Sequence, residues 1–379
     1  MNIAILGCGY VANMYLLTLT MHPELKLIGV MDIERSRAEN LARITGTKVY
    51  PDLQSLLNDS NVDLVVNLTI PQEHFVTSRA CLEAGKHVYT EKPLAMEFSE
   101  AATLVDVAES KGLMLASAPC TLMSQSAQTL WHAVRDNLVG KIRLIYAEMD
   151  DGMISSAPVR TWVNEAGTAW PYVNEFETGC TVEHAGYVLT WLVAIFGPVE
   201  SVTAFSDTLI DDKISGQEIA PADDFTVACI KFRNGIVLRM TNGIYAEHDH
   251  RLRLFGDDGV LLVNDPRNDI SPVRLQRYYS FRRKRFLSPW SKKLPFKVAQ
   301  DQKKIVSYRG SQVRDFCRVI SDMHAALKEN RQPYFSANFA LHVTEITLVC
   351  QNAKKLSISG AMPYQMTTTF EEMEPLSWK

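Results

Sequence analysis

A short run of small residues near the N-terminus constrains the fold of this chain more than any other feature. Gly7-Cys8-Gly9-Tyr10-Val11-Ala12 stands between an apolar strand pattern at 2–6 and a helical pattern at 13–20. In such a Gly-x-Gly-x-x-Ala turn the first glycine allows a tight bend and the second lets the backbone approach a pyrophosphate. The small third residue lets helix and strand pack closely, and the helix start offers free N–H groups to phosphate. We therefore expect a dinucleotide cofactor to be bound by Gly7, Gly9, Tyr10, Val11 and Ala12.

An acidic residue stands where such a turn needs one. The second predicted strand, at 26–31, ends in Asp32, twenty positions after Ala12. A carboxylate there can accept hydrogen bonds from both ribose hydroxyls of an adenosine, and it would repel the additional phosphate of NADP. Arg35 and Arg37 follow closely and keep NADP in consideration. The sequence thus predicts NAD, with NADP as the weaker alternative.

The first third of the chain alternates short apolar strands with helical segments. This pattern predicts an α/β fold with a doubly wound parallel sheet. Ligands bind such sheets at the carboxyl ends of the strands. The run Thr90-Glu91-Lys92-Pro93 follows a predicted strand at 85–89, so we expect it to lie at that edge.

Several segments together resemble the Gfo/Idh/MocA oxidoreductase family, the group of glucose–fructose oxidoreductase and inositol dehydrogenase. They are the glycine turn at 7–12, Ile70-Pro71-Gln72-Glu73-His74, and the run from Ala84 to Pro93 that contains Glu-Lys-Pro. The resemblance implies an N-terminal NAD-binding Rossmann domain at 1–119. It also implies a C-terminal α/β domain at 120–379, with a large, mostly antiparallel sheet that often forms a homo-oligomer interface.

The resemblance also implies a chemistry. Family members transfer a hydride between a nicotinamide and a hydroxyl-bearing carbon, usually of a sugar, a sugar derivative or a cyclitol. Pro71 and His74 match a loop near the nicotinamide ribose. Glu91 and Lys92 match residues at the nicotinamide end, with Lys92 in the active site.

The expected catalytic helix departs from the usual family pattern. Many members carry Asp and His four residues apart, where this chain has Glu183 and Tyr187. Both lie on one helix face, and His184 lies at its edge. We expect Tyr187 to act as the acid/base, Lys92 as its electrostatic partner and hydroxyl anchor, and Glu183 as the orienting group, with His184 as an alternative proton carrier. A rival interpretation is a catalytically inactive NAD-binding sugar sensor, against which the presence of Lys92 argues.

Two other patterns have a structural interpretation beside a functional one. Glu247-His248-Asp249-His250 places both histidines on one strand face, but two ligands are too few for a metal site. We predict no metal and a solvent-facing strand or turn there. The aromatic loop at 162–175 fits the wall of a sugar pocket and ordinary loop packing equally well.

Charge and cysteine usage limit the partners and the compartment. The net charge is −4, which does not favour nucleic acid, and seven dispersed cysteines without a Cys-x-x-Cys pair suggest reduced thiols in the cytoplasm. The insertion at 274–304 holds eleven Lys/Arg and one acid, which gives 11 − 1 = +10. We interpret it first as a solvated insertion. Contact with an anionic membrane surface or with a phosphate-bearing substrate such as a sugar nucleotide is the next alternative, and nucleic acid is unlikely.

Overall fold

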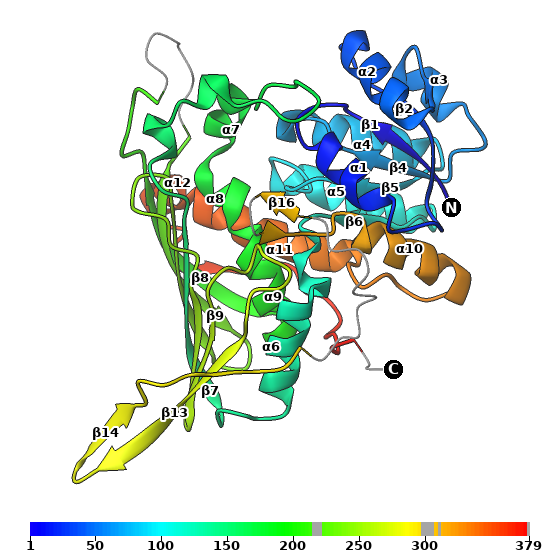
Figure 1. Cartoon of the computed structure of the whole chain (residues 1–379). Helices are drawn as coiled ribbons and strands as arrows, with labels where there is room; N and C mark the ends of the chain where they lie inside the picture. Colours follow the sequence, from blue (N-terminus) through cyan, green and yellow to red (C-terminus); the bar gives the residue numbers. More distant parts are fainter. Residues whose placement is uncertain (214–221, 297–306, 310–311, 377–379) are drawn as a thin grey trace.

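The N-terminal part of the chain forms a parallel sheet whose carboxyl edge faces the rest of the molecule. The computed structural model describes residues 1–213, 222–296, 307–309 and 312–376. Six parallel strands lie in the order β3-β2-β1-β4-β5-β6. This confirms the predicted doubly wound sheet (Figure 1). The strands are β1 (Asn2–Leu6), β2 (Lys26–Met31), β3 (Lys48–Val49), β4 (Leu64–Asn67), β5 (His87–Thr90) and β6 (Leu115–Ser117).

Helices cover both faces of this sheet, which explains why its central strands are apolar throughout. All four residues of β4 are buried, as are the last four of β1. A strand buried on both faces needs apolar side chains at consecutive positions rather than at alternate ones. The helices of this part are α1 (Ala12–Leu19), α2 (Arg35–Thr45), α3 (Leu53–Leu57), α4 (His74–Glu83) and α5 (Phe98–Ser110).

The second half is built on a large mixed sheet. Its strands run in the order β14-β13-β12-β11-β7-β10-β9-β8-β18, with β15 paired to β13. All neighbours are antiparallel except β7 and β10, which confirms a mostly antiparallel sheet. The strands are β7 (Ile142–Asp150), β8 (Val199–Asp207), β9 (Phe225–Phe232), β10 (Val237–Gly243), β11 (Leu252–Gly256), β12 (Gly259–Val263), β13 (Arg274–Phe281), β14 (Lys284–Leu287), β15 (Lys292–Lys293) and β18 (Tyr364–Gln365).

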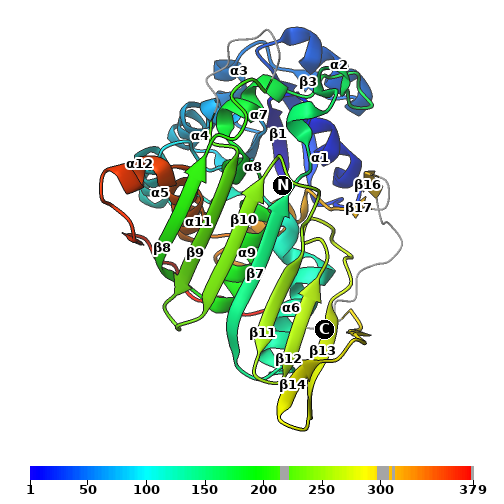
Figure 2. The same ribbon diagram turned by 90° about the vertical axis from the view of Figure 1, so that its left-hand side faces the viewer.

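One face of the ten-stranded sheet is covered by helices. Those behind it are α6 (Gln125–Arg135), α9 (Gly186–Phe196) and α11 (Ala337–Gln351), and Figure 2 looks onto the opposite face. Nearly every residue of α9 is buried, so this helix packs on all sides. The preceding short helix α8 (Cys180–His184) points from the sheet region toward the N-terminal part (Figure 1).

The chain returns to the N-terminal part near its end. Phe316 packs on Tyr15 with ring centroids 5.3 Å apart, and Asp315 accepts from His22 at 2.9 Å. Helix α10 (Arg318–Glu329) follows. The sequence predicts a helix from 312, and this is wrong for its first turn, because 312–313 form strand β17 against β16 (Ser307–Arg309). The Asp315 N–H donates to a buried carboxylate of Asp269 rather than to a helical carbonyl.

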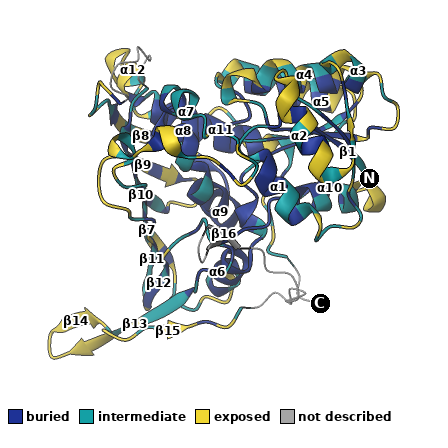
Figure 3. Ribbon diagram, turned by 45° about the horizontal axis from the view of Figure 1, so that its top comes forward, coloured by how far each residue is buried: buried dark blue, intermediate teal, exposed yellow. Residues whose placement is uncertain are grey.

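The basic insertion begins as a β-hairpin. Strands β13 and β14 project from the end of the sheet, and Figure 3 shows β14 as exposed. Tyr279 stacks on Phe286, and Trp290 is 81% exposed. Residues 297–304 of the insertion lie outside the described residues. Among the described helices, none combines the length and the apolar character needed to cross a membrane.

Candidate active site

A cavity of about 650 Å³ connects the glycine turn with the end of α8 and the start of α9. Its walls hold most of the residues that the sequence predicts for cofactor and catalysis. Gly7, Ala12 and Asp32 are not among the lining residues. The predicted residues that line it are Gly9, Tyr10, Val11, Pro71, His74, Glu91, Lys92, Glu183, His184 and Tyr187.

Gly7 and Gly9, the two glycines of the turn, have different roles. Gly7 has φ +92°, and a Cβ built on it would lie 2.6 Å from the backbone of Leu68, so only glycine fits. A Cβ on Gly9 would meet no atom within 4 Å, and Gly9 lines the cavity. A side chain at Gly9 would therefore fill cavity space that a pyrophosphate needs. Ala12 is fully buried between helix and strand, and these three positions fit a dinucleotide.

Asp32 is bound to the turn that it follows. Its two carboxylate oxygens accept the N–H of Cys8 at 2.6 Å and the N–H of Glu34 at 2.7 Å. These bonds fix the carboxylate next to the glycine turn. Arg37 lines the same cavity. A carboxylate and a guanidinium therefore both stand near the expected adenosine end, and an Arg can accommodate the 2′-phosphate of NADP.

The nicotinamide end is braced by hydrogen bonds between loops. Both ring nitrogens of the buried His74 face carbonyl oxygens, at 2.7 Å for Pro93 and 3.0 Å for Thr69. Burial lowers the pKa of His74, so the ring is neutral at neutral pH. Glu91 accepts the Tyr15 hydroxyl at 2.6 Å. His74 thus ties the loop after β4 to the Glu-Lys-Pro segment.

Lys92 and Glu183 form an ion pair in the wall of the cavity. Only 17% of the Lys92 side chain and 6% of the Glu183 side chain are exposed. Burial works against the charged ammonium, but the charge of Glu183 raises the pKa of Lys92 above its usual range. Lys92 therefore stays protonated, which suits a hydrogen-bond donor and excludes a general base.

Glu175, on α7 (Tyr172–Thr178), joins this pair as a second carboxyl group. Burial and the neighbouring charge of Glu183 raise the pKa of Glu175 well above its usual range, and the two carboxyls are hydrogen-bonded. Two close carboxylates cannot both ionise easily, so Glu175 holds the proton and Glu183 the charge. From the sequence, Glu175 is placed only in the aromatic loop. Its contact with Glu183, eight positions later, depends on the fold and not on a regular spacing.

Tyr187 is flanked by two arginines that the sequence analysis does not identify. The Nη1 of Arg314 donates to the Tyr187 hydroxyl at 3.3 Å, and its guanidinium carbon lies 4.8 Å from the ring centroid. Arg267 lies 5.9 Å from the same ring. Arg314 is 127 positions away in sequence, so only the folded chain reveals the contact.

His184 faces a different set of groups from Tyr187. Its Nε2 lies 2.7 Å from Oδ2 of Asp151, and its buried Nδ1 has no hydrogen-bond partner in the described part of the chain. Burial would raise the pKa of Asp151, but its interactions with His184, His250 and Arg267 hold that pKa well below its usual range. Asp151 is therefore a carboxylate that fixes the His184 ring in the cavity wall.

The aromatic loop lines the cavity and also packs on itself and on the N-terminal part. Trp162 and Trp170 pack on each other with ring centroids 5.0 Å apart, and both line the cavity. The loop also lies against the glycine turn, since the Asn164 side chain donates to the Tyr10 carbonyl at 3.1 Å. A second bond, from Asn40 on α2 to the Ala166 carbonyl at 3.2 Å, holds the same loop.

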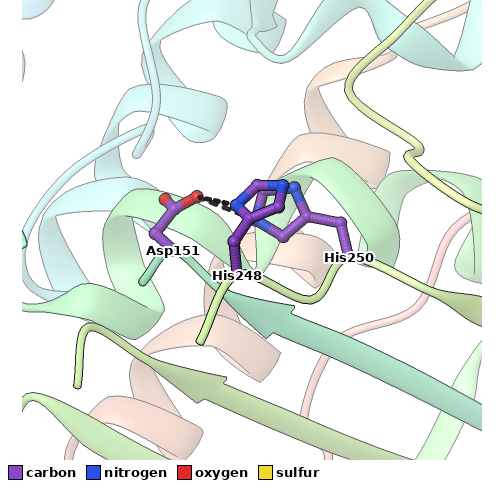
Figure 4. Close-up of side chains that lie close together, drawn as sticks. All are labelled: Asp151, His248 and His250. Carbon is purple, nitrogen blue, oxygen red and sulfur yellow. Dashed lines mark ion pairs between the residues drawn. The ribbon is translucent and has the colours of Figure 1, made fainter. Parts of the chain in front are cut away.

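The predicted solvent-facing position of the two histidines near 250 is wrong for one of them. His250 is buried, and its Nε2 lies 2.8 Å from Oδ1 of Asp151, whereas the His248 side chain is 57% exposed (Figure 4). Only two ligands are visible in the sequence motif because Asp151, which directly follows β7, lies nearly a hundred positions earlier. Asp151 brings the number of metal-type ligands to three.

Comparison with known sequences identifies both halves of the chain. The family described as "Oxidoreductase family, NAD-binding Rossmann fold" matches residues 1–118, and the "GFO/IDH/MocA C-terminal domain" matches 127–262. The chain is 22% identical to myo-inositol 2-dehydrogenase of Thermotoga maritima, over 70% of this chain and 76% of that protein. It is 24% identical to trans-1,2-dihydrobenzene-1,2-diol dehydrogenase of Mus musculus, over 73% of this chain and 82% of that protein.

Solved structures show the same fold at low sequence identity. A 3-ketoreductase from Actinomadura kijaniata, in complex with NADP and TDP-benzene, matches with a TM-score of 0.71. The two chains are 18% identical, and the match covers 93% of this chain and 97% of that one. The glycine turn, the Glu-Lys-Pro segment and both family matches lead to one conclusion: the chain belongs to the Gfo/Idh/MocA family of oxidoreductases and has its NAD(P)-binding Rossmann fold.

Proposed function

We propose that the chain is an NAD-preferring dehydrogenase or reductase that acts on a hydroxyl-bearing carbon of a sugar, a sugar derivative or a cyclitol. The observation that carries this proposal is the Lys92–Glu183 ion pair in the wall of a cavity that also reaches Gly9 and Tyr187. A charged donor beside a hydroxyl-bearing side chain is what alcohol oxidation needs at the reacting oxygen. An ion pair with a purely structural role would not have to lie in the wall of a cavity.

The residues of the cavity have separate tasks in this chemistry. When bound, the nicotinamide cofactor supplies the hydride acceptor or donor, and the glycine turn and Asp32 would hold its adenosine and phosphates. Lys92 donates to the substrate oxygen, and the charge of Glu183 keeps Lys92 protonated and in place. In reduction Tyr187 gives its Oη proton to the substrate oxygen and becomes a phenolate, and in oxidation that phenolate takes the substrate hydroxyl proton back. Arg314, which donates to Oη, stabilises the phenolate.

The substrate class rests on the relatives and on the cavity walls. The relatives include a myo-inositol dehydrogenase and, over 34% of this chain, a reductase of a dTDP-linked deoxysugar from Streptomyces antibioticus. The cavity offers aromatic faces at Trp162 and Trp170 beside charged donors at Lys92 and Arg267. Aromatic faces suit the C–H surface of a sugar ring, and charged donors suit its hydroxyl groups.

The test is turnover followed by the absorbance of reduced nicotinamide. The wild type and Lys92→Ala would each meet NAD and NADP with a panel of free sugars, cyclitols, sugar acids and sugar nucleotides. We expect a signal with NAD in the wild type and a loss of at least a hundredfold in the variant, whose cofactor affinity is measured in parallel. If the wild type bound NAD and turned over no member of the panel, the sensor interpretation would replace this proposal.

A further inference from the structure

Three side chains that can bind a metal meet at the edge of the cavity. Asp151 directly follows β7, and His248 and His250 lie between β10 and β11. One ligand atom from each lies within 4.8 Å of the others. Figure 4 shows the three side chains close together. Reciprocal backbone hydrogen bonds between Asp150 and Asp249, at 3.0 and 2.9 Å, hold the two segments in register. The backbone pairing of these two segments therefore brings the three ligands together.

The spacing of the ligand atoms suits a small divalent ion. His250 Nε2 lies 2.8 Å and His248 Nδ1 lies 3.9 Å from Oδ1 of Asp151. Ligand atoms about 2.0–2.1 Å from a tetrahedral ion would be about 3.3 Å apart. The two distances to Asp151 lie on either side of that value, and all three atoms lie within 4.8 Å of one another, so small side-chain rotations would bring them around one ion.

His250 has the surroundings of a metal ligand. Its side chain is fully buried, yet neither ring nitrogen makes a well-directed hydrogen bond among the described residues. Buried polar groups are normally hydrogen-bonded, so this ring needs an explanation. The carboxylate of Asp265 lies 3.5 Å from Nδ1, on the side away from the cluster. A carboxylate at that nitrogen would direct the lone pair of Nε2 toward an ion.

Arg267 is the one group that opposes a cation here among the described residues. Its Nη1 lies 2.9 Å from Oδ1 of Asp151. A carboxylate offers about four lone-pair positions, so Asp151 can serve Arg267 and an ion together. With neutral imidazoles, Asp151 and Asp265 against Arg267 give −2 + 1 = −1, which still attracts a divalent ion. Arg267 therefore lowers the affinity of the site for a metal ion but does not prevent binding.

We propose that Asp151, His248 and His250 form a three-ligand site for a divalent transition-metal ion of the zinc type. Two imidazole nitrogens and one carboxylate oxygen favour Zn²⁺ or Co²⁺ over Mg²⁺ or Ca²⁺, which prefer oxygen ligands. Three protein ligands leave a fourth position, as in catalytic rather than structural zinc sites. Asp151 and His248 line the cavity, so the open position faces it. This inference does not depend on the proposed dehydrogenase activity.

The test is titration of the chelator-treated full chain with Zn²⁺ and with Mg²⁺, followed by calorimetry. We expect one Zn²⁺ per chain and no saturable Mg²⁺ binding. Because His248 is largely exposed, His248→Ala should fold normally and lose at least tenfold in Zn²⁺ affinity. His324→Ala, on α10 and outside the cluster, is the matched control and should bind as the wild type does. Arg267→Gln should bind Zn²⁺ more tightly.

A second readout keeps the proposal independent of turnover. Chain loaded with Co²⁺ should show the visible absorption of a four-coordinate ion, and this band should vanish in His248→Ala. Equal Zn²⁺ binding by the wild type and His248→Ala would assign the ion to other surface groups and overturn the proposal. Absence of stoichiometric binding in both the wild type and Arg267→Gln would overturn it as well.

Discussion

Replacement of Glu175 by glutamine should stabilise the folded chain above about pH 5. The folded chain holds a proton on Glu175, whereas the unfolded chain releases it near the ordinary pKa of 4.5. A carboxyl group with a raised folded-state pKa adds its full stabilisation only below the unfolded pKa. That contribution is lost as the pH rises toward the folded pKa, at about 1.4 kcal/mol per pH unit.

Glutamine keeps the shape of the protonated carboxyl and can still donate to Glu183, but it has no proton to lose. The free energies of unfolding of the wild type and Glu175→Gln should therefore be close at about pH 5. They should separate in favour of the variant by up to about 3 kcal/mol at pH 7, which is two pH units at the slope above. This full difference in the free energy of unfolding requires that Glu175 of the folded chain stays protonated up to pH 7.

Urea unfolding followed by tryptophan fluorescence, at half-unit steps between about pH 5 and 7, measures this difference. Glu177→Gln, on the same helix but outside the carboxyl pair, is the matched control and should show no such trend. Glu183→Gln should instead lose about 3–5 kcal/mol, because it leaves the charge of Lys92 buried without its partner. A stability difference between the wild type and Glu175→Gln that does not change with pH would refute the assignment of the proton to Glu175.

Three further predictions concern the proton carrier, the cofactor and the assembly. Tyr187→Phe should lower kcat by about 10²–10⁴-fold and His184→Gln by less than tenfold if Tyr187 moves the proton, and the reverse order in single-turnover rates would select His184. Gly9→Ala should fold with wild-type stability and lose cofactor affinity, whereas Gly7→Ala should also lower the melting temperature because its Cβ meets the Leu68 backbone. Comparison of melting curves with NAD titrations checks this, and equal stability of the two variants would contradict it. The uncovered sheet face carries Phe205, 56% exposed, and we expect this face to form a homo-oligomer. Phe205→Asp should lower the mass found by light scattering, and an unchanged mass would count against that interface.

The N-terminal part was largely predictable because its signals are local. The glycine turn, the acidic residue after the second strand and the alternation of strands with helices each lie within about 30 residues. The predicted strand at 2–6 is β1, and the predicted strand at 26–31 is β2. Local spacing also places Glu183 and Tyr187 together, although the structure divides their helix into α8 and α9.

The remainder of the site depends on contacts between distant segments. Asp151 meets His184, His250 and Arg267 through the pairing of sheet strands, and no periodicity in the sequence reveals that meeting. The helix predicted from 312 is wrong in its first residues for the same reason. The Asp315 N–H donates to Asp269, which is distant in the sequence, and not to a helical carbonyl. Contacts between residues on different strands of the sheet cannot be predicted from spacing along the chain.

The aromatic loop over the glycine turn has a consequence for the order of events in a catalytic cycle. Asn164 and Ala166 connect this loop to Tyr10 and Asn40, so the loop lies against the glycine turn, where we expect a dinucleotide to bind. A dinucleotide seated beneath it would need those two hydrogen bonds to open before departure, whereas a small substrate would not. We therefore expect an ordered sequence, with the dinucleotide bound first and released last, and a turnover number set by its departure.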